Sequence, residues 1–457
     1  MKNIEDILLE LKPDMISTLQ DWISVNSIKS APKENAPFGS ALRVMLDKAL
    51  ALCDEMGFDT LDVDGYAGHA EMGEGKDEDA LAMLVHLDIV PDGDGWTYNP
   101  FGGEIVDNKM YGRGTMDDKG PAVAALYAML AVKKAGIPLK RKVRIIFGCD
   151  EESGMQCMEY YRQKLTMPRS GFSPDAGFPV INIEKGMIGV QISAKPSKEG
   201  LQVVRWSTGD RTNVIPGVSY ALVKAGDEII PRVKEVSEKY GWEIKAEPDD
   251  EFMRITVKGV AGHAAYPHAA ENAISRLLIV LKELGAEGPL KTLANTVATD
   301  PYGEGLNIAV EDKLSGRLTN NIGIIRVDDS SIYATLDMRC PVLTDRAYLL
   351  RILKQSLPEF EIIQTTDKAP HYVPAESELV QKLLEAYNEV TGLPKETLAI
   401  GGGTYAKMLD EGVAFGIAFP GDPDKAHRAD EYVDLDKLFD SSRIFARAIV
   451  KLAKGDE

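Results

Sequence analysis

The chain has 457 residues, of which 44% are hydrophobic and 27% are charged, and its formal net charge is −19 at pH 7. The composition is typical of a globular protein, and the length suggests two or three domains. The negative charge argues against nucleic acid or a membrane as a partner, because basic surfaces bind both. The N-terminus lacks a signal-peptide layout and no CxxC pair occurs, which favours a cytoplasmic protein with reduced thiols.

The first part of the chain alternates between helical and strand patterns. Residue spacing predicts helices near 4–25, 38–56 and 120–136, and strands at 79–88, 142–148 and 178–186. Such alternation indicates an α/β fold whose central sheet is mostly parallel and sandwiched by helices. In these sheets the reactive residues lie beyond the carboxyl ends of the strands.

The middle of the chain has a different pattern. Short strands and turns follow one another from about 189 to 370. The later elements expected are a strand at 254–259, helices at 271–285, 375–391 and 435–453, and a hairpin at 323–339. We therefore predict one discontinuous domain, formed by residues 1–188 and 373–457, with an α+β domain of residues 189–372 inserted into it.

Polar residues stand at the end of the first predicted strand, 79–88. Alternate residues of a strand face the same side, so His86 and Asp88 point together. A metal-binding imidazole with a carboxylate that fixes its tautomer would have this arrangement. A core histidine hydrogen-bonded to a nearby aspartate is the alternative.

A glycine-rich loop, GRGTMDDKGP (112–121), leads into the helix near 120–136. It lacks P-loop spacing, and the adjacent Asp117 and Asp118 would repel a phosphate. Two interpretations remain open from this segment alone: a metal-binding loop in which Asp117 bridges two ions, and a tight turn with an acidic helix start.

Three adjacent acids, residues 150–152, stand at the end of the strand at 142–148. Adjacent carboxylates are costly unless cations neutralise them or their pKa values rise. This suggests that Glu152 binds a metal while Glu151 holds a proton. A solvated acidic loop is the alternative.

Two further candidates complete a donor set. Asp175 precedes a predicted strand, and His427 stands in a polar loop where it could also be a surface residue. The candidate metal ligands are then His86, Asp117, Glu152, Asp175 and His427. Two imidazoles and three carboxylates suit two zinc ions that share one carboxylate, and manganese or cobalt also fits. The combination indicates a hydrolase.

Five motifs resemble those of the co-catalytic di-zinc metallopeptidases, the family that includes carboxypeptidase G, the aminoacylases, succinyl-diaminopimelate desuccinylase and the PepV-type dipeptidases. In chain order they are HLD, GRGTMDDKG, DEESG, PDAGFP and AHRADEY. The resemblance covers nearly the whole chain, and the segments PHYVP and GGGTYA bring it nearest to the PepV-type branch. It implies that residues 1–188 and 373–457 form the catalytic domain and residues 189–372 a lid.

The resemblance also implies two divalent ions, with zinc favoured. One ion would be held by His86, Asp117 and Asp175, and the other by Asp117, Glu152 and His427. Glu151 would be the general base toward a bridging hydroxide, and Asp88 would orient His86. The peptide bond between Asp117 and Asp118 would be cis.

In the lid, the resemblance implies three substrate contacts. His263 would contact the reacting carbonyl oxygen, Asn213 would contact the substrate, and Arg339 would grip the substrate carboxylate. The backbone-amide loop of the same pocket would be Gly401, Gly402 and Gly403.

These assignments predict metal-dependent hydrolysis of dipeptides with a free N-terminus, whose amine would bind Glu151 or Asp88. The lid has roughly 180 residues, against ~100–150 for a typical domain. A lid of this length could deliver His263 within one chain, which favours a monomer. The alternatives are an N-acyl-amino-acid deacylase or desuccinylase of the same family, and a non-catalytic metal-binding protein on the same scaffold.

Overall fold

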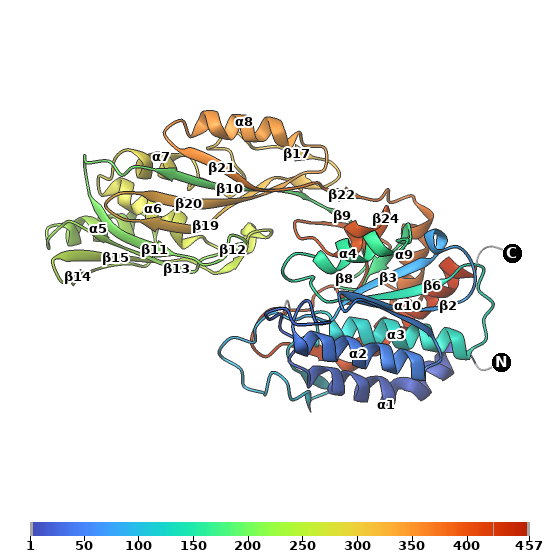
Figure 1. Cartoon of the computed structure of the whole chain (residues 1–457). Helices are drawn as coiled ribbons and strands as arrows, with labels where there is room; N and C mark the ends of the chain where they lie inside the picture. The colour runs from blue at the N-terminus through green and yellow to red at the C-terminus, as the bar shows by residue number, and fades with distance from the viewer. Residues whose placement is uncertain (1–2, 424, 455–457) are drawn as a thin grey trace. The chain divides into compact units, whose positions relative to one another are not determined.

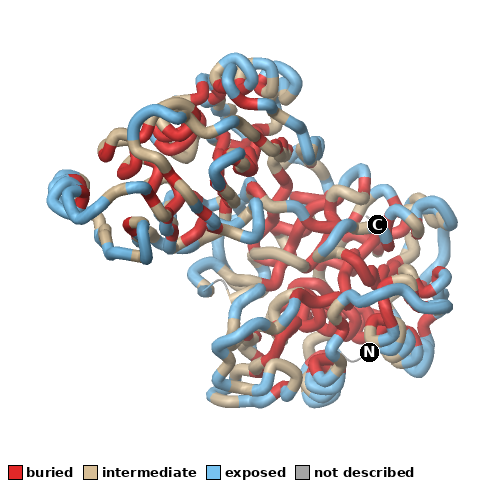
Figure 2. Tube along the Cα trace, turned by 60° about the vertical axis from the view of Figure 1, so that its left-hand side comes forward, coloured by how far each residue is buried: buried red, intermediate tan, exposed pale blue. Residues whose placement is uncertain are grey.

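The computed structural model describes residues 3–423 and 425–454. The chain divides into two compact units, and each has its own hydrophobic core (Figures 1 and 2). Unit 1 comprises the residues up to Asn182, Val373–Leu398 and the residues from Gly403 onward, and unit 2 comprises Ile183–Tyr372 and Ala399–Gly402. The catalytic and lid roles, with their boundaries, stay predictions.

A mixed sheet forms the centre of unit 1. In sheet order its strands are β1 (Asp59–Val63), β2 (Ala67–Met72), β6 (Val143–Gly148), β3 (Leu81–His86), β7 (Ser170–Ser173), β24 (Glu411–Ala414) and β9 (Val180–Glu184), with β23 (Thr397–Ile400) beside β9. The strand β22 (His371–Tyr372), which also pairs with β9, falls within the residue range of unit 2. The pairs β6–β3, β3–β7 and β7–β24 are parallel. The pairs nearer the edges, such as β1–β2 and β2–β6, are antiparallel. The predicted α/β fold is confirmed, with its parallel pairs at the centre of the sheet.

Helices pack around this sheet (Figure 1). They are α1 (Ile4–Ile23), α2 (Ser40–Glu55), α3 (Lys119–Lys134), α4 (Gln156–Lys164), α9 (Glu378–Thr391) and α10 (Leu435–Ala453), with short 3-10 turns at η1 (Asp77–Asp79) and η3 (Tyr405–Met408). Helix α3 contacts α1, α10 and the strands β3 and β6. Its residues from Lys119 to Val132 are all buried, which explains why this helix is apolar on every side.

Short strands extend unit 1 around its loops. They are β4 (Glu104–Val106), β5 (Lys109–Tyr111) and β26 (Tyr432–Asp434), which pair with one another, and β8 (Ala176–Gly177) with β25 (Ile417–Ala418). The β26–β5 pairing brings the chain near residue 432 beside the chain near residue 111. The last part of the sequence is thereby joined to the first part within one unit.

Unit 2 is an antiparallel sheet with helices packed on it. In sheet order the strands are β14 (Ile244–Asp249), β15 (Phe252–Lys258), β13 (Val218–Val223), β11 (Val203–Thr208), β19 (Thr319–Val327), β20 (Ile332–Cys340), β10 (Gly186–Ala194) and β21 (Glu361–Lys368). The other elements are β12 (Val214–Ile215), β16 (Gly262–His263), β17 (Glu311–Asp312), β18 (Gly316–Arg317), η2 (Pro267–Ala269), α5 (Ile229–Tyr240), α6 (Ala273–Glu283), α7 (Pro289–Asn295) and α8 (Arg346–Ser356). The predicted hairpin is β19–β20, whose turn is fixed because Asp328 accepts the Ser330 and Ser331 amides.

The described helices of both units are too short or too polar to cross a membrane. Within residues 3–423 and 425–454, none of them combines the length and the apolar character that crossing a bilayer requires.

Candidate active site

The carboxyl ends of β6, β3 and β7 bring predicted site residues together. His86 is the last residue of β3, Glu151 and Glu152 come just after β6, and Asp175 comes just after β7. These three strands are parallel neighbours with β3 in the middle. The acids that follow β6 and β7 therefore lie on either side of the histidine.

Asp117 lies between the two histidines. Its Oδ1 atom is 2.9 Å from Nε2 of His86, and its Oδ2 atom is 2.9 Å from Nε2 of His427. Oε1 of Glu152 lies 2.8 Å from the same nitrogen of His427, and Oδ2 of Asp175 lies 3.6 Å from that of His86. The structure thus brings all five candidate ligands together, with one carboxylate facing two imidazoles. The peptide bond that follows this aspartate is cis, as the resemblance implies.

The donor atoms fit divalent metal ions. Within the described residues, one set consists of His86, Asp117 and Glu152 and another of His86, Glu151 and Asp175, and the atoms of each set lie within 4.8 Å of one another. Imidazole and carboxylate donors suit zinc, and they suit manganese or cobalt as well. Glu151, which the sequence predicts to be a base, thus lies close to the candidate ligands His86 and Asp175.

Burial and mutual repulsion raise the pKa values of two acids in this cluster. Burial, followed by the charge of Asp117, raises the pKa of Asp175 to about 7, and burial also raises the pKa of Glu151 well above its usual range. Burial opposes the charged form of His427, but hydrogen bonds to Asp117 and Glu152 outweigh it and raise the pKa of this imidazole to about 11. Divalent cations among these groups would relieve the repulsion, and the imidazole would release its proton on binding one.

The carboxylate of Asp88 lies closer to the backbone of the two glutamates than to the imidazole of His86. Its Oδ1 accepts the Glu151 backbone N–H at 3.1 Å, and its Oδ2 accepts that of Glu152 at 3.0 Å. Nδ1 of His86 donates to the Asp88 carbonyl oxygen at 2.9 Å, whereas the carboxylate is 3.5 Å away. The carbonyl is thus the group that sets the tautomer of His86, a role that the sequence assigned to the carboxylate.

The remaining acid of the DEESG segment is neutralised from a distant loop. Asp150 is fully buried, and its Oδ1 lies 2.7 Å from Nζ of Lys29, while its Oδ2 accepts the Gln156 N–H at 3.0 Å. This pairing leaves Glu151 and Glu152 as the acids that face the histidines. The sequence analysis missed Lys29, because no local pattern links it to an acid 121 residues later.

Tyr405 supports the His86 ring from the side. Their ring centroids are 6.2 Å apart in an edge-on arrangement, and the tyrosine hydroxyl lies 2.9 Å from Sγ of Cys157. The tyrosine belongs to the GGGTYA segment, where the sequence analysis considered only the glycines. Tyr405 and His86 are both buried, so the tyrosine ring forms part of the packing beside the imidazole.

A further buried histidine, His69, belongs to the core. Its Nδ1 lies 2.7 Å from the Tyr161 hydroxyl, and burial lowers its pKa to about 4. The unfolded chain takes up this proton near pH 6.5, so the free energy of unfolding decreases as the pH falls from about 6.5 to about 4, by up to ~3 kcal/mol for this group.

We expect His69→Gln to flatten the pH dependence of urea unfolding between about pH 6.5 and pH 4. His268→Gln, at an exposed position, is the control, and a slope unchanged by His69→Gln would contradict the assignment.

In unit 2, the structure brings Asn213 and His263 onto adjoining segments. The Ala264 N–H donates to the Asn213 carbonyl at 2.9 Å, and Val214 pairs with His263 between β12 and β16. Nδ1 of His263 accepts the Ala265 N–H at 3.2 Å, so in the neutral ring Nε2 carries the proton. A donor of this kind suits a carbonyl oxygen, and its contact with substrate stays a prediction.

Arg339 is buried against partners of unit 2. Its Nε and Nη2 bind the Asp337 carboxylate at 2.6 and 2.9 Å, and its Nη1 donates to the Gly401 carbonyl at 2.6 Å. These bonds use three of the five guanidinium hydrogens. Gly401 and Gly402 belong to unit 2 and Gly403 to unit 1, and the contact made by Gly401 is through its carbonyl rather than its amide.

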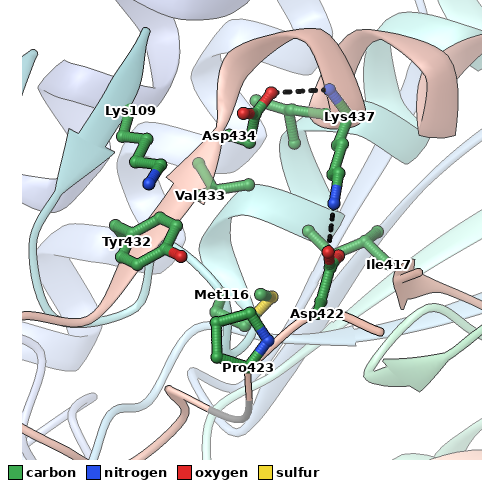
Figure 3. Close-up of a pocket in the computed structure, with 10 residues that line it drawn as sticks. Lys109, Met116, Ile417, Asp422, Pro423, Tyr432, Val433, Asp434 and Lys437 are labelled. Carbon is green, nitrogen blue, oxygen red and sulfur yellow. Dashed lines mark hydrogen bonds and ion pairs between the residues drawn. The ribbon is translucent and has the colours of Figure 1, made fainter. Parts of the chain in front are cut away.

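A cavity of about 260 Å³ in unit 1 is distinct from this cluster (Figure 3). Lys109 lies 4.5 Å from the ring centroid of Tyr432, Lys437 pairs with Asp422, and Met116 lines the cavity between them. None of the described residues that line it is a predicted site residue. This cavity is therefore not the predicted active site.

Comparisons with known proteins bear on the family. Residues 82–451 match the model of peptidase family M20/M25/M40. The chain is 36% identical over 465 residues to "Putative dipeptidase YtjP" of Bacillus subtilis (strain 168), which covers 99% of this chain and 100% of that protein. It is 31% identical over 460 residues to "Putative dipeptidase MW1694" of Staphylococcus aureus (strain MW2), with 97% and 98% covered.

Solved structures share the fold. The crystal structure of human carnosine dipeptidase 1 matches with a TM-score of 0.63 and 16% identity over all of both chains. That of the di-peptidase Dug1p from Saccharomyces cerevisiae matches with a TM-score of 0.60 and 14% identity over 99% of this chain and 98% of that one. The fold class and the expectation of a hydrolytic metallopeptidase are confirmed. The chain therefore belongs to peptidase family M20/M25/M40.

Proposed function

We propose that this chain is a metal-dependent dipeptidase for substrates with a free amino terminus. The observation that carries the proposal is the Asp117 carboxylate, whose two oxygens each lie 2.9 Å from a different imidazole, those of His86 and His427. Two divalent ions that share one carboxylate need this arrangement. Relatives named as dipeptidases support the substrate class.

The proposed cofactor is a pair of zinc ions. The ligands would be His86, Asp117 and Asp175 for one ion and Asp117, Glu152 and His427 for the other. When bound, such ions polarise the peptide carbonyl and lower the pKa of the attacking water. Chelation should abolish activity, and titration with zinc, manganese or cobalt should restore it, with a plateau at two equivalents per chain.

Glu151 is the proposed general base. Its backbone is fixed by Asp88, and burial raises the pKa of its carboxyl above the usual range, which favours holding a proton. It accepts the proton of the attacking water and passes it to the departing amine. Asp88 is 1% exposed and both of its oxygens accept backbone hydrogen bonds, so Glu151 is the better candidate to bind the substrate amine as well.

Two side chains of unit 2 complete the proposal. His263 would donate a hydrogen bond from Nε2 to the reacting carbonyl oxygen, and Arg339 would bind the carboxylate at the far end of the substrate. With both ends bound, a dipeptide would fill the site and a longer chain would not. We also propose a cytoplasmic monomer, and light scattering on the purified protein tests the oligomeric state.

Substrate competition tests the function. The enzyme should hydrolyse a free dipeptide, and it should act at least about tenfold less well on its N-acetylated form and on a tripeptide. Preference for the acetylated form would favour a deacylase or desuccinylase. A metal-loaded protein that hydrolyses none of them would be a binding protein on the same scaffold.

Substitution of Arg339 tests the carboxylate contact. Lysine lacks the planar fork, so Arg339→Lys should raise KM for a dipeptide by about tenfold and spare its C-terminal amide. Because Asp337 holds the guanidinium at 2.6 and 2.9 Å, Asp337→Asn should show a smaller change in the same direction. Equal losses on the acid and the amide would contradict this role.

A further inference from the structure

An ion pair in the core of unit 1 has no part in the chemistry proposed above. Arg113 and Glu431 have side chains that are 1% and 0% exposed, and Nη1 of the arginine lies 2.5 Å from Oε2 of the glutamate. A buried ion pair rarely adds stability compared with well-packed apolar residues. The position of this pair among the loops that carry the candidate ligands indicates another use.

The glutamate holds the loop of the bridging aspartate. Oε1 of Glu431 accepts the backbone N–H groups of Gly114 at 3.0 Å, Met116 at 2.9 Å and Asp117 at 3.3 Å. Gly114 has φ of +90°, a conformation that side chains rarely adopt, and the loop can present these amides to one oxygen. The backbone of Asp117 is therefore fixed by a residue from the other end of the chain.

The arginine holds two other loops. Its Nη1 donates to the Arg428 carbonyl at 3.3 Å, and its Nη2 donates to the carbonyls of Asp92 at 3.1 Å and Pro91 at 3.4 Å. The Trp96 ring covers the guanidinium, with its centroid 5.2 Å away. One side chain thus connects the loop after β3, which follows His86, with the loop that contains His427.

The loop of the second histidine needs such support. His427 has φ of +61°, a left-handed conformation that is unfavourable for a residue with a side chain and persists only where the surroundings fix it. The carbonyl of the next residue, Arg428, is one of those bound by Arg113. The ion pair therefore holds the backbone on both sides of the 2.9 Å contact between Asp117 and His427, Arg113 through the Arg428 carbonyl and Glu431 through the Asp117 N–H.

We propose that Arg113 and Glu431 are positioning residues that set the spacing between Asp117 and His427, two ligands of the ion that Asp117, Glu152 and His427 would hold. This inference rests on the proposed metal site and deepens it. Among the described residues, the pair makes no hydrogen bond or ion pair with the side chain of a candidate ligand. It acts through backbone groups of the loops, and through the Asp117 N–H directly.

The test is metal affinity rather than turnover alone. Substitutions around a metal site typically weaken binding by about 10–100-fold. We expect Arg113→Met and Glu431→Gln to weaken one of the two zinc-binding events by about this factor in calorimetry. The visible absorption bands of the cobalt-loaded protein should change because the coordination geometry is altered, and kcat should fall with KM nearly constant.

Arg144→Met is the matched control. Arg144 is another buried arginine of unit 1, 3% exposed and paired with Glu71 at 2.6 Å, and none of its recorded partners is a candidate ligand. Its loss should lower the melting temperature and leave zinc affinity and the cobalt spectrum unchanged. Glu431→Gln keeps the shape of the side chain, so it decides the question if Arg113→Met does not fold.

The possible outcomes distinguish failure of the positioning role from failure of the proposed function. Wild-type protein that binds two zinc ions, with both variants binding them equally tightly, would overturn the positioning role and leave the proposed function intact. Wild-type protein that binds no pair of ions would instead overturn the proposed function. Weaker binding of one of the two ions in both variants, absent from Arg144→Met, would support the inference.

Discussion

Glu151→Gln should lower kcat for a dipeptide by about 10²–10⁴-fold, the usual contribution of a general base, while two metal ions remain bound. Glutamine keeps the size of the side chain, and the backbone N–H that donates to Asp88 at 3.1 Å is unaffected. The loss would therefore come from the missing proton acceptor. Steady-state kinetics combined with metal analysis of the same preparation checks both halves of the expectation.

The neighbouring glutamate supplies the control. Glu152 lies 2.8 Å from His427 and is a proposed ligand, so Glu152→Gln should weaken metal binding as well as turnover. Glu151 also belongs to a donor set with His86 and Asp175. If Glu151→Gln lost an ion, Glu151 would be a ligand rather than the base, and near-native turnover would remove it from the mechanism.

The sequence was most informative where short-range order decides the structure. The strands predicted at 79–88 and 142–148 are β3, which ends at His86, and β6, and they are parallel neighbours. Parallel strands end on one edge of a sheet, so the contents of two local segments were enough to place a histidine near two acids. The apolar helix α3 could also be predicted, because burial on all sides requires a continuous apolar run in the sequence.

Contacts between distant segments could not be predicted in this way. Lys29 neutralises Asp150 from 121 residues away, and Arg113 meets Glu431 across 318 residues. Nothing in either local pattern names its partner. The choice between the carbonyl and the carboxylate of Asp88 as the acceptor for His86 is likewise a matter of a few tenths of an ångström, which no spacing rule contains.

Asp117→Asn should reduce metal binding from two ions to one or none and abolish dipeptide hydrolysis. The carboxylate presents one oxygen to His86 and the other to His427, each at 2.9 Å. An amide has only one oxygen, and its NH₂ group cannot bind a cation. We expect an affinity loss larger than the ~10–100-fold that follows changes outside the ligand set. Zinc calorimetry measures both the stoichiometry and the affinity.

The adjacent aspartate isolates the effect of the bridge. Asp118 is fully buried, its Oδ2 accepts the His86 N–H at 2.9 Å, and its Oδ1 has no hydrogen-bond partner among the described residues. Asparagine keeps an oxygen that can accept the same His86 N–H, so Asp118→Asn should leave the backbone at His86 in place. This variant should bind two ions. If Asp117→Asn also bound two, the carboxylate would not be shared between them, and the arrangement on which the dipeptidase proposal rests would have to be abandoned.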